Sequence, residues 1–233
     1  MNKETIHTTD VRNFFKRWPR FYYFISAVFS QMMYCGLSSK SFLKKYQRSG
    51  TTLNLGSGPR ILGKEVINID MHPYHGVSVV ADITSVPLAD GSAGRVVCDN
   101  VLEHVKDPRQ AVSEIKRLLA RGGVAYISTP FLYPFHVSPN DYQRWTASGL
   151  AELFQDFEMV ELGMRAGPFS TLTIYLCYVA ATILSLGYEP IYWLLINLFM
   201  FVFLPVKLFD LILNYWPLSI NMAAILFCVV RKR

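Results

Sequence analysis

Between Arg165 and Lys207 the chain runs for 41 residues with a single charged side chain, Glu189. Two apolar segments, residues 169–187 and 191–206, flank the sequence Gly-Tyr-Glu-Pro, which is typical of a tight turn. Each segment is close to the shortest length, about 17 residues, of a membrane-spanning helix. The sequence therefore predicts an apolar helical hairpin that either spans a bilayer twice or only dips into it. Both forms return the chain to the side that it left.

The last apolar segment, Ala223–Val230, has eight residues and is followed by three cationic ones. It is far shorter than the roughly 20 residues that cross a bilayer as a helix. Its isoleucine and paired valines suit a strand that is buried on both faces. Because a hairpin returns the chain to its starting side, this strand can complete a sheet formed by earlier residues. Between the hairpin and the strand, residues 207–216 carry charges three apart among apolar residues, which predicts a helix at a membrane interface.

From residue 51 onward, short apolar runs alternate with helical stretches, which predicts an α/β fold with a parallel sheet. One helix should begin after the capping residue Asp107 with Pro108 and end before Gly122. A second should follow Thr146 and end near Phe154. The expected strands before the hairpin are residues 51–55, 66–70, 77–81, 95–99, 124–129 and 158–163.

Charge is distributed unevenly along the chain, whose net charge is +6. Residues 1–60 hold ten Lys and Arg and two acids, together with the aromatic run Phe-Tyr-Tyr-Phe at 21–24. This segment predicts contact with an anionic membrane face, the alternative being a basic leader that keeps the chain soluble. Residues 21–37 are apolar but interrupted by polar side chains, which favours an interfacial or packed helix. Nucleic acid is a weaker prediction, because residues 61–170 carry an excess of acids.

The four cysteines lie far apart in apolar runs, and no pair has metal-ligand spacing, which predicts reduced, buried thiols in a cytosolic protein. Acids precede the first apolar run and no small-residue cleavage site follows it, so a signal peptide is not expected. His72 and His75 lie three apart in a polar loop with no further ligand nearby. No metal site is therefore predicted.

The sequence "LNLGSG" at 53–58 places two glycines after the first strand, where the backbone can pass close to a ligand. Ile61 occupies the place where a dinucleotide fingerprint has a small residue. Asp70 ends the second strand and Asp82 follows the third, and two such acids could bind ribose hydroxyls and an adenine amine. The pattern predicts a nucleoside ligand without a pyrophosphate, although both acids could also be ordinary turn residues.

With these motifs the chain resembles the class I S-adenosylmethionine-dependent methyltransferases, in a type 11-like branch. The matching sequences are "LNLGSGP" at 53–59, "NID" at 68–70, "ADI" at 81–83, "VPLADGS" at 86–92, "NVLEHVKDP" at 100–108, "LLARGGVAYISTP" at 118–130 and "AAILFCVVRK" at 223–232. The resemblance implies a Rossmann-like seven-stranded sheet with an antiparallel last strand, here with the apolar helical hairpin inserted before that strand. The expected parts are a membrane-interface segment at 1–48, a methyltransferase domain at 49–168 and 219–233, and a membrane-associated insertion at 169–218.

The resemblance also implies S-adenosylmethionine as the cofactor and assigns residues to its parts. Its methionine end would meet Gly56, Ser57 and Gly58, its ribose Asp70, its adenine Met71, Asp82 and Ile83, and its methyl-transfer side Asn100 and Leu102. The chain departs from the family in two places. Only seven residues separate Gly58 from Val66, so the first crossover helix is at most a turn. Ala93 and Gly94 replace the usual aromatic–acid pair.

A second cluster, "FHVSPNDYQRWTASGL" at 135–150, resembles a stretch of methyltransferases associated with surface-glycan and lipid-linked sugar pathways. His136 and His104 are candidate bases for a hydroxyl acceptor, since histidine titrates near neutral pH. Asp141 is a third catalytic candidate, with Tyr142, Arg144 and Trp145 as candidate substrate residues. Alternatives remain: Asp141 could cap a helix, Trp145 could lie in the core, His104 could orient a loop, and the reaction could lack a dedicated base.

The sequence thus predicts a methyltransferase at the cytoplasmic face of a membrane, acting on a hydroxyl of a lipid-linked or lipophilic acceptor. No nucleic acid and no metal are expected as partners. A prenylated quinone or phenol, or a phospholipid head group, would be an alternative acceptor. A non-catalytic membrane subunit that keeps the fold is the hypothesis from another class. A nicotinamide oxidoreductase is disfavoured by the missing third small residue.

Overall fold

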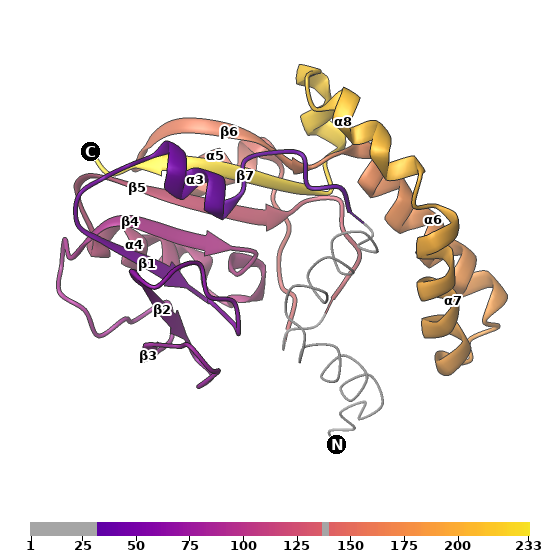
Figure 1. The fold of residues 1–233 in the computed structure, drawn as a ribbon, viewed down its shortest axis with the longest axis horizontal. Coiled ribbons are helices and arrows are strands. Elements are labelled where there is room, and N and C mark those ends of the chain that lie inside the picture. The colour runs from indigo at the N-terminus through magenta and orange to yellow at the C-terminus, as the bar shows by residue number, and fades with distance from the viewer. Residues whose placement is uncertain (1–31, 137–139) are drawn as a thin grey trace.

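A computed structural model describes residues 32–136 and 140–233 (Figure 1). Its centre is a seven-stranded sheet in the order β3-β2-β1-β4-β5-β7-β6, in which β7 alone runs antiparallel to its neighbours. The predicted α/β fold with a seven-stranded sheet is confirmed. The strands are β1 (Thr51–Leu55), β2 (Val66–Asp70), β3 (Val79–Val80), β4 (Ala93–Asp99), β5 (Leu119–Pro130), β6 (Glu158–Ala166) and β7 (Ile225–Arg231).

The C-terminal apolar run forms β7, which lies between β5 and the edge strand β6. β7 pairs with β5 on one side and β6 on the other, so that Val229 lies opposite both Tyr126 and Glu161. Residues 225–230 are all buried. A strand covered on both faces and bonded on both edges needs apolar side chains at every position, which explains its unbroken run.

Helices cover the two faces of the sheet unequally. On one face, α4 (Pro108–Leu118) and α5 (Ala147–Leu153) pack on the main hydrophobic core, whose fully buried members include Ile115 and Leu150. The caps Asp107 and Thr146 accept backbone amides as predicted. On the other face, α3 (Ser39–Lys45) inserts Phe42 among residues of β4, β5 and β7.

The connection from β1 to β2 contains no helix, although all its residues are described, which confirms the expectation of a shortened crossover. Two side-chain amides link β1, β2 and the loop that follows β2. The side-chain amide of Asn54 donates to Asn68 Oδ1 over 2.9 Å, and the amide of Asn68 donates to the carbonyl of Gly76 over 3.1 Å. These bonds satisfy polar groups that would otherwise be buried without partners.

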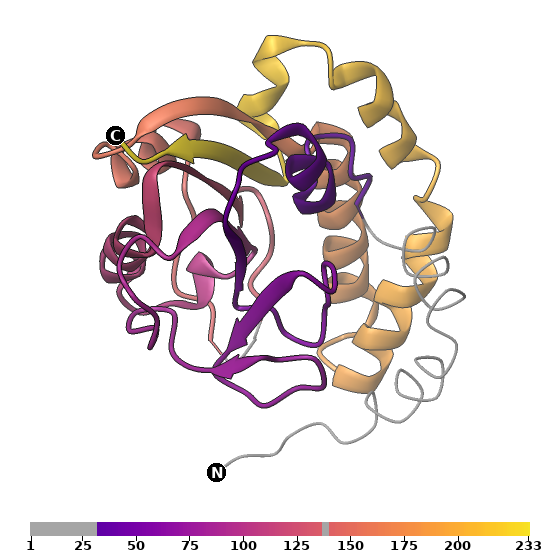
Figure 2. The same ribbon diagram turned by 60° about the vertical axis from the view of Figure 1, so that its left-hand side comes forward.

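The apolar insertion is a helical hairpin of α6 (Pro168–Leu184) and α7 (Glu189–Val202), joined by a turn with Gly187 at φ +82°. Figures 1 and 2 show the hairpin at one end of the sheet, beyond the end of β5. The carboxylate of Asp210 accepts the amides of Phe169 and Ser170, each over 2.8 Å, at the start of α6. Buried at 0% exposure, Asp210 thus joins the two ends of the insertion.

The segment after the hairpin differs from the predicted single helix over 207–216. It breaks into η2 (Val206–Phe209), α8 (Asp210–Leu213) and η3 (Pro217–Met222), because the chain turns to bring Asp210 under α6. Among the described residues, no single helix has both the length and the hydropathy to cross a membrane. Glu189–Val202 and Val206–Leu213 meet both requirements only as a pair, which is bent by 51°.

The prediction of a helix over residues 21–37 is wrong for 32–37, and residues 21–31 lie outside the described part. Residues 32–37 are extended beside β6, with a bridge between Tyr34 and Ala166. The guanidinium of Arg165 lies 4.4 Å from the ring centroid of Tyr34. Met33 donates its amide to Ser170 Oγ over 2.8 Å, which ties this segment to α6.

Candidate active site

A cleft of about 740 Å³ lies at the carboxyl ends of β1, β2 and β4. This is the edge where open parallel sheets bind ligands. The cleft brings together most of the predicted site residues, although they are spread over nearly 90 positions of the sequence. The predicted residues that line it are Gly56, Gly58, Asp70, Met71, Asp82, Ile83, Asn100, His104 and Tyr142.

Gly56 and Gly58 both have a left-handed backbone, with φ +64° and +54°. A Cβ on Gly56 would lie 2.5 Å from the methyl carbons of Val101, so close packing excludes a side chain there. A Cβ on Gly58 would meet no protein atom within 4 Å and would project into open space at the cleft. The glycine loop therefore leaves room for a ligand at Gly58.

The two acids line the cleft and hold backbone amides of its loops. Asp70 accepts from the amide of Gly58 over 2.7 Å and from that of His72 over 2.9 Å. Asp82 uses Oδ1 to accept the amide and the hydroxyl of Thr84, both over 2.8 Å. A carboxylate has about four acceptor positions, so each acid retains lone pairs for hydroxyl or amine donors. The turn role and the ligand role are therefore compatible.

Apolar side chains flank the space between the two acids. Met71 is 56% exposed and lines the cleft, and Ile83 borders it from the core side. Tyr74, which sequence analysis did not single out, lines the same region and is 44% exposed. Large exposed apolar side chains beside two carboxylates suit a flat, aromatic ligand with polar edges.

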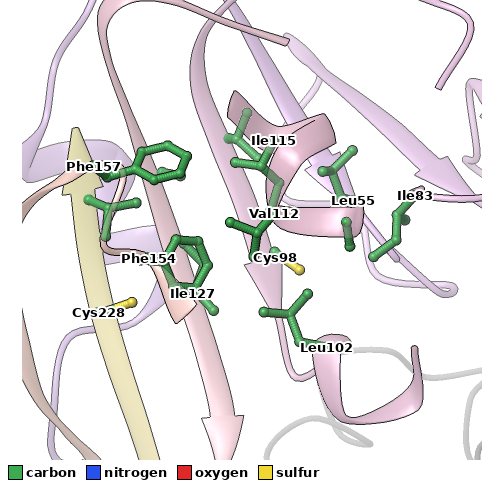
Figure 3. Packing of buried hydrophobic residues seen from close by; sticks show 14 of the residues in the cluster. Leu55, Ile83, Cys98, Leu102, Val112, Ile115, Ile127, Phe154, Phe157 and Cys228 are labelled. Carbon is green, nitrogen blue, oxygen red and sulfur yellow. The ribbon is translucent and has the colours of Figure 1, made fainter. Parts of the chain in front are cut away.

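Two predicted cofactor residues do not line the cleft. Leu102 is fully buried in the main core and points toward Val112 of α4 (Figure 3), because the turn η1 (Leu102–His104) directs it inward. Val101 lines the cleft in its place. Ser57 is buried, and its hydroxyl donates to the carbonyl of Gly58 over 3.1 Å. It supports the loop rather than the ligand space.

The second predicted cluster forms around an ion pair. Asp141 accepts two hydrogen bonds from the guanidinium of Arg144, one of them over 2.6 Å, and a third from the amide of His136 over 2.9 Å. Although burial opposes ionisation, these bonds lower the pKa of Asp141 to about 2. Asp141 does not cap a helix, since residues 140–146 are not helical.

The two histidines lie beside each other, with ring centroids 5.0 Å apart. Nδ1 of His104 contacts the carbonyl oxygen of Asn140, which can only accept, so the proton of the neutral ring sits on Nδ1. Nε2 of His104 then carries the lone pair, and His104 lines the cleft. His136 lies behind it, and burial lowers the pKa of its imidazole.

The predicted substrate residues have different positions. Tyr142 is 49% exposed and lines the cleft. Arg144 is held by Asp141 and by the carbonyls of Tyr133 and Pro134. Trp145 is 8% exposed and belongs to the main core, so its prediction as a substrate residue is not met.

Sequence reasoning missed Glu103, which is fully buried and whose carboxylate oxygens have no hydrogen-bond partner in the described part of the chain. Burial raises its pKa to about 8. Its Oε1 lies 3.8 Å from Nε2 of His104. An acid inside "VLEHV" is an unusual core residue, and that position could have drawn attention to it.

Part of this chain is similar to known methyltransferases. Residues 53–127 match the family model described as a methyltransferase domain. An uncharacterized methyltransferase of Mycobacterium sp. (strain KMS) is 34% identical over 103 residues, an alignment that covers 36% of this chain and 41% of that protein. Residues 53–127 thus resemble a methyltransferase domain. The chain spans less than half the length of its mycobacterial relative.

Solved structures of methyltransferases share the fold of this chain. An S-adenosylmethionine-dependent methyltransferase from Thermotoga maritima aligns with a TM-score of 0.54 and 15% identity, covering 95% of this chain and 99% of that one. Phosphoethanolamine N-methyltransferase 2 of Haemonchus contortus, solved with S-adenosylmethionine, aligns with a TM-score of 0.53 and 16% identity, covering 95% of this chain and 59% of that one. At such identities the likeness concerns the fold alone.

S-adenosylmethionine is the cofactor of this class of domain, and the cleft residues fit it. Gly58 leaves open space where a side chain would obstruct a ligand. Asp70 can hold ribose hydroxyls with its remaining lone pairs, and Met71 and Ile83 can flank the adenine near Asp82. The helix terminus that would meet the cofactor carboxylate is absent after β1.

Proposed function

We propose that this protein transfers the methyl group of S-adenosylmethionine to a hydroxyl of a lipid-linked or lipophilic acceptor, such as a glycan intermediate on a lipid carrier. The reaction would take place at the cytoplasmic face of a membrane. The observation that carries the proposal is the position of the apolar hairpin beside the histidine end of the cofactor cleft. The acceptor end of the site and the most apolar surface of the molecule then lie next to each other.

A chain of contacts connects the cleft with the hairpin. The ring of His136 lies 5.0 Å from His104 and 5.1 Å from Tyr133, which follows β5. Tyr133 packs in turn against the cluster that contains Ile174, and Tyr178 of α6 packs against the same cluster. An acceptor whose hydroxyl reaches His104 could therefore rest its apolar part on the hairpin.

The hairpin and the elements after it expose many large apolar side chains, which marks a surface that meets lipid or another apolar partner. Exposure of such apolar side chains to water is unfavourable in free energy. Those at least half exposed on α6, α7 and the following turns are Val179, Ile183, Leu184, Leu186, Tyr188, Leu194, Leu198, Phe201, Val202, Phe209, Ile212, Tyr215, Trp216, Leu218 and Met222.

When bound, S-adenosylmethionine supplies an electrophilic methyl group on a sulfonium. The acceptor oxygen needs a free lone pair to attack it, so its proton must leave. We assign the activation of this hydroxyl to His104. Two observations support this role: His104 lines the cleft, and the contact of its Nδ1 with Asn140 leaves the lone pair of the neutral ring on Nε2. Asp141 and Arg144 hold the neighbouring loop in position.

Calorimetric titration with S-adenosylmethionine tests the cofactor half of the proposal. We expect binding by the intact protein and a loss of about 10- to 100-fold in Asp70→Asn, since a hydrogen bond to a charged group contributes about 1.5–3 kcal/mol. Asp156→Asn is the matched control, because Asp156 is an exposed acid that pairs with Lys116 outside the cleft. No binding by the intact protein would favour a non-catalytic subunit.

Methyl transfer from labelled cofactor into membrane extracts tests the acceptor half. We expect a lipid-extractable product that separates with sugar-linked lipids, and His104→Ala should abolish its formation while keeping cofactor affinity. Label in an aromatic product would instead identify a prenylated quinone or phenol as the acceptor. Label in water-soluble products alone would contradict a lipophilic acceptor.

Flotation with anionic vesicles tests the membrane contact. Leu194→Glu places a charge on α7 at a residue that is 67% exposed, and it should reduce binding strongly. Val80→Glu changes an equally apolar side chain, 57% exposed, on the edge strand β3 away from the hairpin, and should bind like the unchanged protein. Equal binding by both variants would show that the hairpin does not carry the contact.

A further inference from the structure

The carboxylate of Glu103 is buried at 0% exposure. Within residues 32–136 and 140–233, neither of its oxygens has a hydrogen-bond partner. A buried carboxyl group without partners is destabilising, because it loses its hydration and gains nothing in return. Such a group indicates a ligand that completes its coordination or a proton that neutralises it.

Two imidazoles converge on this carboxylate. One ligand atom each of Glu103, His104 and His136 lies within 4.8 Å of the other two. The closest measured approach joins Glu103 Oε1 and His104 Nε2 over 3.8 Å. Since Asn140 fixes the proton of His104 on Nδ1, the atom nearest Glu103 is the one with the lone pair.

The charged groups around the cluster are compatible with a bound cation. Asp141 is neutralised by two hydrogen bonds from Arg144, so this pair contributes no net charge. Nδ1 of His136 lies 3.2 Å from Asp141 Oδ2 and 3.4 Å from Arg144 Nη2. A metal on Nε2 would require Nδ1 to donate to the carboxylate, which is the outer-shell contact that metal-binding histidines commonly have. Glu103, once ionised, is then the carboxylate of the cluster that lacks a counter-charge.

We propose that Glu103, His104 and His136 bind one divalent transition-metal ion, of which zinc is the expected physiological one. Two imidazole nitrogens and one carboxylate oxygen are a donor set of catalytic zinc sites, which keep a further position open. Ligands of an ion at about 2.1 Å lie some 3.4 Å apart in a tetrahedron, so the ligand atoms, which lie within 4.8 Å of one another, need to approach by up to about 1.4 Å. The sequence predicted no metal, because His136 lies 33 positions after Glu103 and 32 after His104.

The role of the ion rests on the proposed function and specifies it. An acceptor hydroxyl at the open position would lose its proton to water more easily, because a bound cation lowers the pKa of an oxygen ligand. The oxygen then forms a bond to the methyl carbon as the carbon–sulfur bond breaks, and sulfur retains the electron pair. His104 would then activate the hydroxyl through the bound ion, as one of its ligands.

Cobalt titration tests the site without any need for turnover. The untagged full-length protein is treated with a chelator and titrated with Co²⁺, a spectroscopic substitute for zinc. We expect one Co²⁺ per chain, with visible absorption bands of low-symmetry coordination that one equivalent of Zn²⁺ removes. Glu103→Gln and His136→Asn should each weaken Co²⁺ binding by more than about 100-fold, since outer-shell partners alone contribute about 10- to 100-fold.

The matched control is His75→Asn, which removes a histidine outside the cluster and should leave Co²⁺ binding unchanged. Thermal unfolding verifies that each variant folds. S-adenosylmethionine affinity should persist in Glu103→Gln, so failure of the metal site and failure of the cofactor site are distinguishable. Absent or substoichiometric Co²⁺ binding, or equal binding by Glu103→Gln and the unchanged protein, would overturn the proposal and leave Glu103 as a protonated core acid.

Discussion

Gly56 and Gly58 provide a matched pair of substitutions that separates support of the fold from contact with the cofactor. Both residues have a left-handed backbone, with φ +64° and +54°. An alanine in this region costs about 1–2 kcal/mol of strain. The two positions therefore carry the same backbone penalty, and any difference between Gly56→Ala and Gly58→Ala comes from what surrounds the added methyl group.

Their surroundings differ in a way that can be quantified. At position 56 the new Cβ would lie 2.5 Å from both Cγ atoms of Val101, whereas at position 58 no protein atom lies within 4 Å. Overpacking adds about 1–3 kcal/mol. We expect the free energy of unfolding to fall by about 2–5 kcal/mol in Gly56→Ala and by about 1–2 kcal/mol in Gly58→Ala.

For S-adenosylmethionine affinity we expect the opposite order, with the larger loss in Gly58→Ala. The methyl group of Gly58→Ala projects into the cleft, so a penalty of about 1–3 kcal/mol falls on binding and weakens S-adenosylmethionine affinity by about 5- to 150-fold. Denaturant unfolding without cofactor gives the stabilities, and calorimetric titration gives the affinities. If Gly58→Ala binds S-adenosylmethionine as tightly as the unchanged protein, the loop does not approach the cofactor and the site assignment fails.

Three further changes test the packing around the site. Glu114→Gln should lower stability by about 1–3 kcal/mol at pH 7, because the carboxylate accepts from the side chain of Arg117 and from the amide of Val86. The pKa of Glu114 is lowered, chiefly by Arg117, so this stabilisation is present above the ordinary pKa of 4.5 and should disappear from denaturant curves as the pH falls below it. Asp210→Ala should lower the unfolding free energy by about 1–3 kcal/mol or more and increase proteolysis of the hairpin, because two amides at the start of α6 lose their acceptor. Leu102→Ala should lower it by about 2–5 kcal/mol with little change in cofactor affinity in calorimetry; a large affinity loss in a folded variant would return Leu102 to the cleft.

Local patterns predicted the sheet because the burial of a strand determines which of its positions are apolar in the sequence. β7 is apolar and buried from Ile225 to Val230, since it is bonded on both edges and covered on both faces. Asp107 and Thr146 cap their helices as expected, because a cap depends only on its nearest neighbours in the chain. The glycine pair and the two acids reach one cleft because the carboxyl ends of parallel strands share an edge.

What could not be predicted depends on single-residue geometry or on distant partners. The η1 turn determines that Val101 rather than Leu102 faces the cleft. Both residues are apolar, so the sequence does not show which of the two neighbours points inward. Asp141 has the surroundings of a helix cap in the sequence, yet the nearby Arg144 holds its carboxylate instead. Glu103 belongs to the proposed metal site only because His136, a residue on another loop, lies close to it.

The topology explains why the hairpin and the site lie together. In the register of the sheet, Ile225 at the start of β7 lies opposite Pro130 at the end of β5 and Ala166 at the end of β6. Because β7 is antiparallel to both, any insertion between β6 and β7 must leave and return at the carboxyl edge of β5. That edge carries the loop of Tyr133 and His136. An apolar insertion at this point of the chain is therefore brought beside the acceptor end of the cleft, whereas one at the opposite ends of these strands would lie a strand length away.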